Sequence, residues 1–438
     1  MIWVELLVVL AAIFVGVRIG SIGIGFAGGL GVLALAVLGV TPGEMPLDVI
    51  SIIAAVIAAI AAMQIAGGMD YLVDIAERIL RGNPRYLTFL APILTYLMTF
   101  MAGTGHTAFS TMPVITEVAK ENNIRPSRPL SVAVVASQIA ITASPISAAV
   151  VFFSGILEEK GVDYLQLLAV LIPSTFIGCM LTALVFFLWD KARPRNALEF
   201  DPVYQERLAS GKVSPPAPHA RRELAPYAKR SVLIFLIGLL AVMSYATIIS
   251  DKVGLIEEPV MARDQAIIAF MLSTAALIVL LCKVETTAIL SASTFKSGMS
   301  ACICVLGVAW LGTTFVAAHE EQIKSFAGDV LADQPWTLAV ILFFAAALLY
   351  SQAATTKALM PTALALGVSP LAAVASFAAV SALFVLPTYP TLLAAVEMDD
   401  TGSTRIGKYV FNHPFLLPGV LAISFSVALG FLFGGIIL

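Results

Sequence analysis

Long apolar runs are the feature of this chain that most restricts what it can fold into. Of its 438 residues, 59% are hydrophobic and only 12% are charged. Several runs approach or exceed the ~20 residues that a helix needs to cross a bilayer. Lipid cannot pair with backbone N–H and C=O groups, so a helix must satisfy them internally. The sequence therefore predicts an all-α polytopic membrane protein.

The composition also argues against other classes of protein. A net charge of −3 and a pI near 5.9 do not indicate nucleic-acid binding. The N-terminal run has no basic region and its first charge is Glu5, which favours a retained first span over a cleaved signal peptide. The four cysteines lie in apolar runs without C-x-x-C spacing. We therefore expect buried thiols, no metal site and no cofactor.

The polar segment 190–230, with its proline-rich stretch SPPAPHARRELAP, divides the chain into two membrane halves, 1–189 and 231–438. Each half is predicted to contain spans, a re-entrant hairpin, a broken span and a final span. The hairpins cover about 86–119 and 336–368, and the broken spans cover about 130–153 and 370–394. The whole chain then has about ten spans and two hairpins.

The positions of Lys and Arg indicate the orientation, because cytoplasmic loops collect them. If the first span runs inward, about twenty of the 25 Lys and Arg lie inside and about four outside, and Lys357 falls within the membrane. A full crossing at 86–119 would move Lys120, Arg125 and Arg128 outside, which favours the hairpin. Both termini then lie outside and the linker inside. The second half repeats the first in inverted orientation.

Inverted repeats with discontinuous helices are typical of secondary transporters, whose substrate lies near the membrane midplane. The interruptions here are the hairpin tips AGTGH and YSQAATTK and the breaks TASPIS and VLPTYPT. Unpaired backbone at that depth must be buried in protein or face a watery cavity, so the interruptions indicate one shared polar site. Helix N-termini at such a site offer free N–H groups and a positive dipole end, which suit carboxylates.

The residues at these interruptions form the predicted substrate-binding set. In the first break we expect Ser144 to cap a new helix with Pro145 at its first position. In the second break Pro390 follows Tyr389 as a first helical residue in the same way, with Thr388 as an alternative cap. The full predicted set is Gly103, Thr104, Gly105, His106, Thr107, Ser144, Pro145, Ser147, Ser351, Gln352, Thr355, Thr356, Lys357, Pro387, Thr388, Tyr389, Pro390 and Thr391.

Several of these residues also have a purely structural interpretation. The tip glycines equally fit a tight turn, Ser147 can bond back to its own helix, and His106 can be a satisfied residue of a protein interior. The run GFAGGLG, which contains Gly25-x-x-x-Gly29, predicts close helix packing.

Lys357 is the charged residue at greatest predicted depth. A Lys at the bilayer centre costs about 2.5–3.5 kcal/mol on insertion scales, so it needs a partner or a watery site. One interpretation pairs it with an acid elsewhere or points it along the hairpin to the surface. Because no acidic residue lies within 336–368, we favour the other interpretation, in which its charge offsets a substrate carboxylate.

The stretches AGTGH, IAITASPISAAVV, YSQAATTKALMP and FVLPTYPTLLAAVEMDDTGSTRIGKYVFNHPF resemble the Dcu family of C4-dicarboxylate transporters, and its DcuA branch more than DcuB. The resemblance covers nearly the whole chain. It implies uptake, exchange or efflux of fumarate, succinate, malate and aspartate across a bacterial inner membrane, often in anaerobic metabolism, with both termini periplasmic. It also implies kinship with homodimeric elevator carriers of the ion-transporter superfamily, in which hairpin tips and broken helices hold the carboxylates.

The resemblance also bears on coupling. Sodium-coupled relatives carry Ser-Asn-Thr at the hairpin tips, whereas this chain has Gly-Thr-Gly-His and Ser-Gln-Ala-Ala, which favours exchange or proton coupling. The competing classes are an intramembrane enzyme and an anion channel. The sequence lacks G-x-S-x-G, H-E-x-x-H and an intramembrane aspartate pair, and two inverted sets of breaks fit a carrier better than one continuous pore. We therefore predict a transporter, not an enzyme.

The loop charges generate a first testable prediction. In a variant without native cysteines, a Cys placed at Gly254 should react with an impermeant thiol reagent added to intact cells. A Cys placed at Ser210, in the predicted cytoplasmic linker, should stay unmodified until the membrane is opened. Labelling at Ser210 in intact cells would reverse the predicted orientation.

Overall fold

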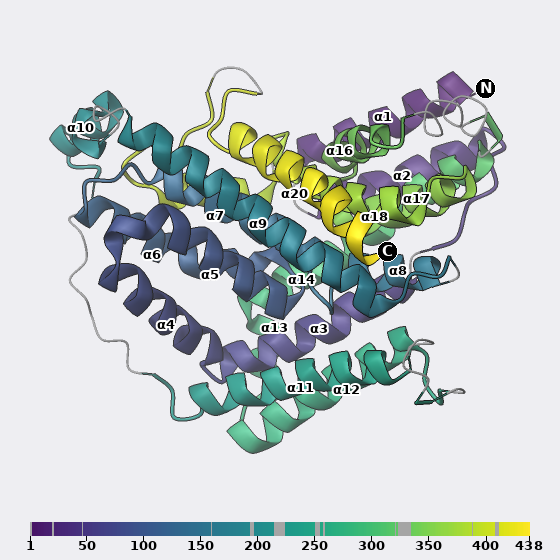
Figure 1. The fold of residues 1–438 in the computed structure, drawn as a ribbon, viewed down its shortest axis with the longest axis horizontal. Coiled ribbons are helices and arrows are strands. Elements are labelled where there is room, and N and C mark those ends of the chain that lie inside the picture. Colours follow the sequence, from purple (N-terminus) through teal and green to yellow (C-terminus); the bar gives the residue numbers. More distant parts are fainter. Residues whose placement is uncertain are drawn as a thin grey trace.

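The computed structural model describes residues 2–19, 22–45, 47–158, 160–192, 197–213, 224–249, 255–256, 259–319, 321–322, 334–387, 389–407 and 411–438. Within these ranges the regular elements are all α-helices or 3-10 helices (Figure 1). Helices satisfy their own backbone groups, as the apolar composition requires.

The elements of the first half begin at the N-terminus and end with a long apolar helix. They are α1 (Ile2–Ile19), α2 (Gly23–Val37), α3 (Leu47–Ile65), α4 (Gly68–Gly82), η1 (Pro84–Tyr86), α5 (Leu87–Ala102), η2 (Gly105–Thr107), α6 (Ala108–Glu121), α7 (Ser127–Ile139), η3 (Ala140–Thr142), α8 (Ala148–Glu158) and α9 (Tyr164–Lys191).

Two short elements, η5 (Leu198–Phe200) and α10 (Pro202–Ala209), lie in the linker. The second half then contains α11 (Ala228–Ile248), α12 (Arg263–Cys282), α13 (Thr286–Ser291), α14 (Ser293–Ala318), α16 (Thr337–Leu349), α17 (Gln352–Ala365), α18 (Pro370–Ser376), η6 (Phe377–Phe384), α19 (Pro390–Met398) and α20 (Leu416–Ile437).

Five helical stretches of the described chain are long and apolar enough to cross a membrane: Pro84–Ala102, Tyr164–Lys191, Ala228–Tyr245, Asp264–Cys282 and Leu416–Ile437. A further pair, Ile50–Ile65 with Gly68–Gly82, is bent by 74°. The bend occurs at Gly67, whose φ of +85° is a conformation that glycine adopts without strain. An all-helical polytopic membrane protein is therefore confirmed.

The closest packing joins helices that are far apart in the sequence. In Figure 1, α9 and α20 run side by side through the middle of the molecule, and they contact each other over much of their length. α5 packs on α7, α2 on α14, and α3 on α12. α11 and α12 lie together at one edge of the molecule, away from α10 at another (Figure 1).

The linker helix α10 is anchored to loops of both halves. Asp201 caps α10 by accepting a hydrogen bond from the Val203 N–H at 3.0 Å. The same buried carboxylate lies 3.7 Å from the Arg125 guanidinium and 3.6 Å from that of Arg405. Arg207 also donates to the backbone carbonyl of Asp400 at 2.9 Å. Most of the proline-rich stretch that follows α10 lies outside the described residues.

Close packing at the glycine-rich start of α2 is confirmed for one of its two spaced glycines. A Cβ built on Gly307 of α14 would lie 1.9 Å from the backbone oxygen of Gly25, so the two helices touch backbone to backbone. A Cβ on Gly29 would meet nothing within 4 Å. Gly25 therefore lies at the crossing with α14, and Gly29 does not.

This crossing generates a prediction about stability. Gly307→Ala should lower the free energy of unfolding by about 1–3 kcal/mol, because an extra methyl forces the two backbones apart. The measurement is the melting temperature of the purified protein in detergent. Gly29→Ala, on the facing helix, is the matched control and should leave the melting temperature unchanged or slightly raised. Equal effects of the two changes would contradict the assignment of the crossing.

Candidate functional site

The two hairpin tips and the two breaks meet in one region of the fold. η3 contacts η6, α5 contacts η3, α17 contacts η6, and α19 contacts α7. The breaks fall between η3 and α8, at residues 143–147, and between η6 and α19, at residues 385–389. Segments from both halves of the chain therefore surround the same polar region.

The tip of the first hairpin packs directly against the first break. Gly103 ends α5 with a φ of +67°, and a Cβ there would lie 3.2 Å from the backbone oxygen of Ile146. The hydroxyls of Thr99 and Thr107 are 3.0 Å apart, and the Thr107 hydroxyl also lies 3.3 Å from the Thr104 carbonyl. Glycine at this tip serves both the turn and the close approach.

The expected helix start in the first break is wrong. α8 begins at Ala148, three residues later than the predicted start at Pro145. Ser147, not Ser144, supplies the cap, because its hydroxyl accepts a hydrogen bond from the Val150 N–H at 3.2 Å. A proline at the first helical position was a sound local signal, but the tertiary contacts of this segment override it.

Those contacts use Ser144 and Pro145 differently. The Ser144 hydroxyl donates to the Phe100 carbonyl at 2.7 Å, which lies in the last turn of α5 and has no partner within its own helix. The Pro145 carbonyl accepts from the Tyr164 hydroxyl at 2.6 Å. The first break is therefore bonded to the first hairpin on one side and to α9 on the other.

At the second hairpin tip, the chain turns at Tyr350, with a φ of +55°. Ser351 then caps α17 by accepting from the Ala354 N–H at 3.1 Å. The hydroxyls of Thr355 and Thr356 donate back to carbonyls of their own helix, at 2.7 and 2.6 Å. Their protons are thus engaged, and the first N–H groups of α17 are donors that this tip can offer to a ligand.

At the second break, the expected helix start is confirmed. Tyr389 is the N-cap of α19 and Pro390 is its first residue. The Tyr389 ring lies 6.1 Å from the Tyr350 ring, centroid to centroid, so the second tip and the second break are neighbours. Pro387 is buried, whereas Thr388 lies outside the described residues.

Three further predicted residues lie around the two tips. Gly105 begins η2 beside α7, where a Cβ would lie 3.7 Å from the Ser137 carbonyl. His106 belongs to η2, but its side chain is outside the described part of the chain. The Lys357 ammonium lies 5.7 Å from the centroid of the Phe152 ring on α8. This cation–π contact directs the Lys toward the first broken span.

Sequence reasoning missed the residue that joins these segments. Gln138 is fully buried near the end of α7. Its amide Nε2 donates to the Thr391 hydroxyl at 2.9 Å. Its backbone carbonyl accepts from the Gln352 amide at 3.3 Å and from the Ser381 hydroxyl at 3.2 Å. The sequence signal was a single amide, next to Ser137, in the otherwise apolar run Val132–Ile141.

The loop after α19 satisfies its own acidic residue. The buried Asp399 carboxylate accepts from the N–H groups of Thr401 and Thr404 and from the Ser403 hydroxyl. Next to it, Lys120 binds Asp400 at 3.1 Å. Burial lowers the pKa of Lys120, but its bonds to carboxylates outweigh this effect and raise the pKa above its usual value. These contacts hold the end of α19 against α6.

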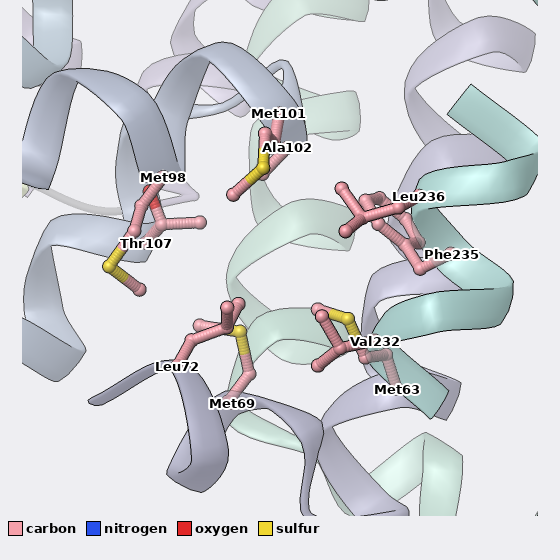
Figure 2. Close-up of a pocket in the computed structure, with 10 residues that line it drawn as sticks. All are labelled: Met63, Met69, Leu72, Met98, Met101, Ala102, Thr107, Val232, Phe235 and Leu236. Atoms are coloured by element: carbon pink, nitrogen blue, oxygen red, sulfur yellow. The ribbon is translucent and has the colours of Figure 1, made fainter. Parts of the chain in front are cut away.

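A small apolar cavity lies beside the first hairpin tip (Figure 2). Met98, Met101, Ala102 and Thr107 line it from the hairpin. The remaining walls come from α3, α4 and α11: Met63, Met69, Leu72, Val232, Phe235 and Leu236. Figure 2 shows methionine side chains from both sides turned toward the space between these helices. Four of the ten lining residues are methionines, which come from α3, α4 and the hairpin, and α11 contributes the apolar side chains Val232, Phe235 and Leu236. The flexible, unbranched methionines therefore lie on the hairpin side of the boundary with α11.

Comparison with known proteins gives consistent matches over the full length. The family model described as an anaerobic C4-dicarboxylate membrane transporter matches residues 1–438. The C4-dicarboxylate transporter DcuA of Wolinella succinogenes is 65% identical over 435 residues, which are 99% of each chain. DcuA of Escherichia coli K12 is 59% identical over 439 residues, covering 100% of both. The anaerobic C4-dicarboxylate transporter DcuB of Escherichia coli O6:H1 is 36% identical over 98% of each.

A solved structure has a similar fold. The crystal structure of the Alcanivorax borkumensis YdaH transporter aligns with a TM-score of 0.54, at 14% identity, over 86% of this chain and 84% of that one. At this identity the likeness concerns the fold alone.

The bond between the first hairpin and the first break generates a prediction. Ser144→Ala should remove the donor of the partly buried Phe100 carbonyl. Loss of this bond costs about 0.5–1.5 kcal/mol and should lower the melting temperature of the purified protein. Ser174→Ala is the matched control, because that buried hydroxyl donates to the Leu171 carbonyl within its own helix. A Ser144 variant as stable as the Ser174 variant would show that this bond does not hold the break.

Proposed function

Because the chain belongs to the DcuA branch of the Dcu family of anaerobic C4-dicarboxylate membrane transporters, we propose that it carries its substrate by an elevator-type alternating-access mechanism. The chain is a C4-dicarboxylate transporter and not an enzyme. The proposal concerns how it binds and moves the substrate. The observation that carries it is the meeting of both hairpin tips and both breaks around Gln138.

The proposed architecture consists of two inverted repeats, 1–189 and 231–438, joined by the linker 190–230. About ten spans and two hairpins cross or enter the membrane. In this arrangement α2, α3, α6 and α8 correspond to α12, α14, α17 and α19. The packing supports the correspondence, because it is exchanged between the halves: α2 packs on α14 and α12 on α3, while α17 packs on α8 and α6 on α19.

A sequence echo also supports the repeat. The tripeptide Val-Ala-Ser occurs at 135–137, shortly before the first break, and again at 374–376, before the second break. Both copies are buried. Both copies lie in the first helical part of a broken span, in α7 and in α18.

The moving unit of the elevator would comprise the two hairpins, the two broken spans, α9 and α20. The scaffold would comprise α1 to α3, α11, α12 and α14. The methionine-lined cavity in Figure 2 lies on the boundary between the two. Methionine is unbranched and adapts to changing neighbours, so a boundary of this kind suits surfaces that must slide past each other.

We place the substrate carboxylates at the helix N-termini created by the breaks and tips. A C4-dicarboxylate brings two negative charges, whereas a helix N-terminus offers only about half a positive charge. Lys357 supplies a full cation beside the second tip, and its contact with Phe152 shows that it faces the first broken span. The binding set remains the predicted one, from Gly103–Thr107, Ser144–Ser147, Ser351–Lys357 and Pro387–Thr391.

The cellular setting is proposed on the same basis. The asymmetry of Lys and Arg in the loops supports a cytoplasmic linker and two periplasmic termini. The similar transporters named above come from bacteria, which supports a bacterial inner membrane. A homodimer, and exchange or proton coupling in place of sodium coupling, follow from the resemblance to elevator carriers and from the tip sequences.

Counterflow in proteoliposomes tests the mechanism. Vesicles loaded with unlabelled fumarate should accumulate labelled fumarate, succinate, malate or aspartate, and the initial rate should saturate. The rate should depend little on sodium. Flux that does not saturate and shows no counterflow would favour a channel and overturn the carrier mechanism.

Lys357 provides a specific test of the site. Lys357→Gln keeps much of the length and hydrogen bonding but removes the charge, so affinity for fumarate and succinate should fall tenfold or more, equivalent to ~1.4 kcal/mol. Binding titrations on the purified variant measure this. Lys296→Gln, which removes an exposed cation from α14, is the control and should bind normally. An unchanged dissociation constant in the Lys357 variant would leave that residue structural.

A further inference from the structure

Gln138 carries a polar atom that the fold leaves unused. Its amide nitrogen is bonded to the Thr391 hydroxyl at 2.9 Å. Its amide oxygen, Oε1, is buried and has no hydrogen-bond partner within the described part of the chain. Leaving a buried acceptor unpaired costs about 1–3 kcal/mol. Such atoms in a native protein call for an explanation.

The segments around Gln138 are held together by other atoms of this residue and not by Oε1. The end of α7 frees the Gln138 backbone carbonyl, and Gln352 and Ser381 satisfy it from the second half. The Thr391 hydroxyl fixes the amide nitrogen and so orients the amide. The backbone holds the segments together, and the side-chain oxygen is left as an acceptor where both tips and both breaks meet.

The chemistry of the substrate class shows what such an acceptor can recognise. At neutral pH both carboxylates of a C4-dicarboxylate are ionised and only accept hydrogen bonds. An amide oxygen therefore gains nothing from them. The members of the class differ at C2: malate carries a hydroxyl and aspartate an ammonium group, both donors, whereas succinate and fumarate carry none.

We infer that Gln138 determines specificity for the substituent at C2, with Oε1 accepting a hydrogen bond from the ammonium of aspartate or the hydroxyl of malate. This inference rests on the proposed substrate site. A site with a buried acceptor discriminates against ligands that lack the donor, because the acceptor then stays unpaired.

The two repeats differ at the position that this role requires. Gln138 follows the Val-Ala-Ser of the first half, and Phe377 follows that of the second. The Phe377 ring packs on Phe153, with centroids 4.5 Å apart, and offers no amide. Succinate and fumarate have two equivalent ends, which two equivalent repeats could bind in the same way. An unpaired amide oxygen supplied by the first repeat alone can distinguish the substituted carbon of malate or aspartate from the other.

The access of a ligand to Oε1 requires the second hairpin tip to move. Gln352, the first residue of α17, is bonded to the Gln138 backbone and covers it. The bond is a single neutral amide contact at 3.3 Å, and such a bond contributes only about 0.5–1.5 kcal/mol. Of the hydrogen bonds to Gln138, movement of the tip breaks this one.

Binding of four acids to a single variant tests the inference. Gln138→Met keeps the length and bulk of the side chain but removes the acceptor. Affinity for aspartate and malate should fall at least tenfold, while affinity for succinate and fumarate changes less than about threefold. Ser381→Ala is the matched control, because it removes a bond to the Gln138 backbone and leaves the amide in place. It should alter all four affinities equally.

A ligand series on the unmodified protein provides a second measurement that does not depend on the variant folding. Fluorosuccinate has the shape and charge of malate but no donor at C2. It should bind as succinate does, at least tenfold more weakly than malate. In the Gln138→Met protein, malate and fluorosuccinate should become equal.

Three results would overturn the inference. These are an unchanged ratio of aspartate to succinate affinity in Gln138→Met, an equal loss for all four acids, or fluorosuccinate binding as tightly as malate. The equal loss would mean that the amide serves the shared carboxylates or the packing. If instead the proposed carrier mechanism is wrong, the unmodified protein will show no saturable counterflow with any of the four acids.

Discussion

A backbone group left unpaired inside a membrane must find its partner within the protein, and the arrangement around the breaks in this fold depends on that constraint. The Phe100 carbonyl, at the end of α5, is satisfied by the Ser144 hydroxyl from the first break. The Gln138 carbonyl, at the end of α7, is satisfied by Gln352 and Ser381 from the second half. Each interrupted helix is thus completed by a side chain from another interrupted segment.

This mutual dependence explains why the polar residues of so apolar a chain concentrate at the breaks. Mean hydropathy is +0.96, yet hydroxyls and amides follow one another at the tips and breaks. A neutral hydrogen bond contributes only about 0.5–1.5 kcal/mol, but a buried group without a partner costs about 1–3 kcal/mol. The interruptions therefore stabilise one another. Removing one partner destabilises the segment whose backbone group it satisfies.

Hydrogen bonds and apolar contacts occur in different places in this fold, and their distribution suits movement of the hairpins past the scaffold. Hydrogen bonds link the first hairpin, both broken spans and the second tip into one network. At the cavity beside the first tip, in contrast, the lining is mainly methionine and other apolar side chains. These apolar contacts lose little of their stabilising energy when one surface shifts past the other, because methionine adapts to new neighbours. The proposed elevator mechanism needs a polar site that stays intact while its surroundings change.

Sequence by itself determined the fold class, the places where helices are interrupted and the family. Those features depend on composition and local residues: apolar runs, paired tips and breaks, and long family-specific strings. Pro390 as the first residue of α19 is also a local matter, and it was predicted correctly. The same rule failed at Pro145, because the bonds of Ser144 to Phe100 and of Pro145 to Tyr164 come from elements far along the chain.

Only the tertiary structure decided which polar residues meet. Gln138 is an isolated amide in an apolar run, and its partners Gln352, Ser381 and Thr391 lie more than two hundred residues away. In a membrane helix that is apolar all round, periodicity does not tell which face is buried. The pairing of helix ends with distant side chains is likewise invisible to any local pattern, because it exists only once the two halves have packed against each other.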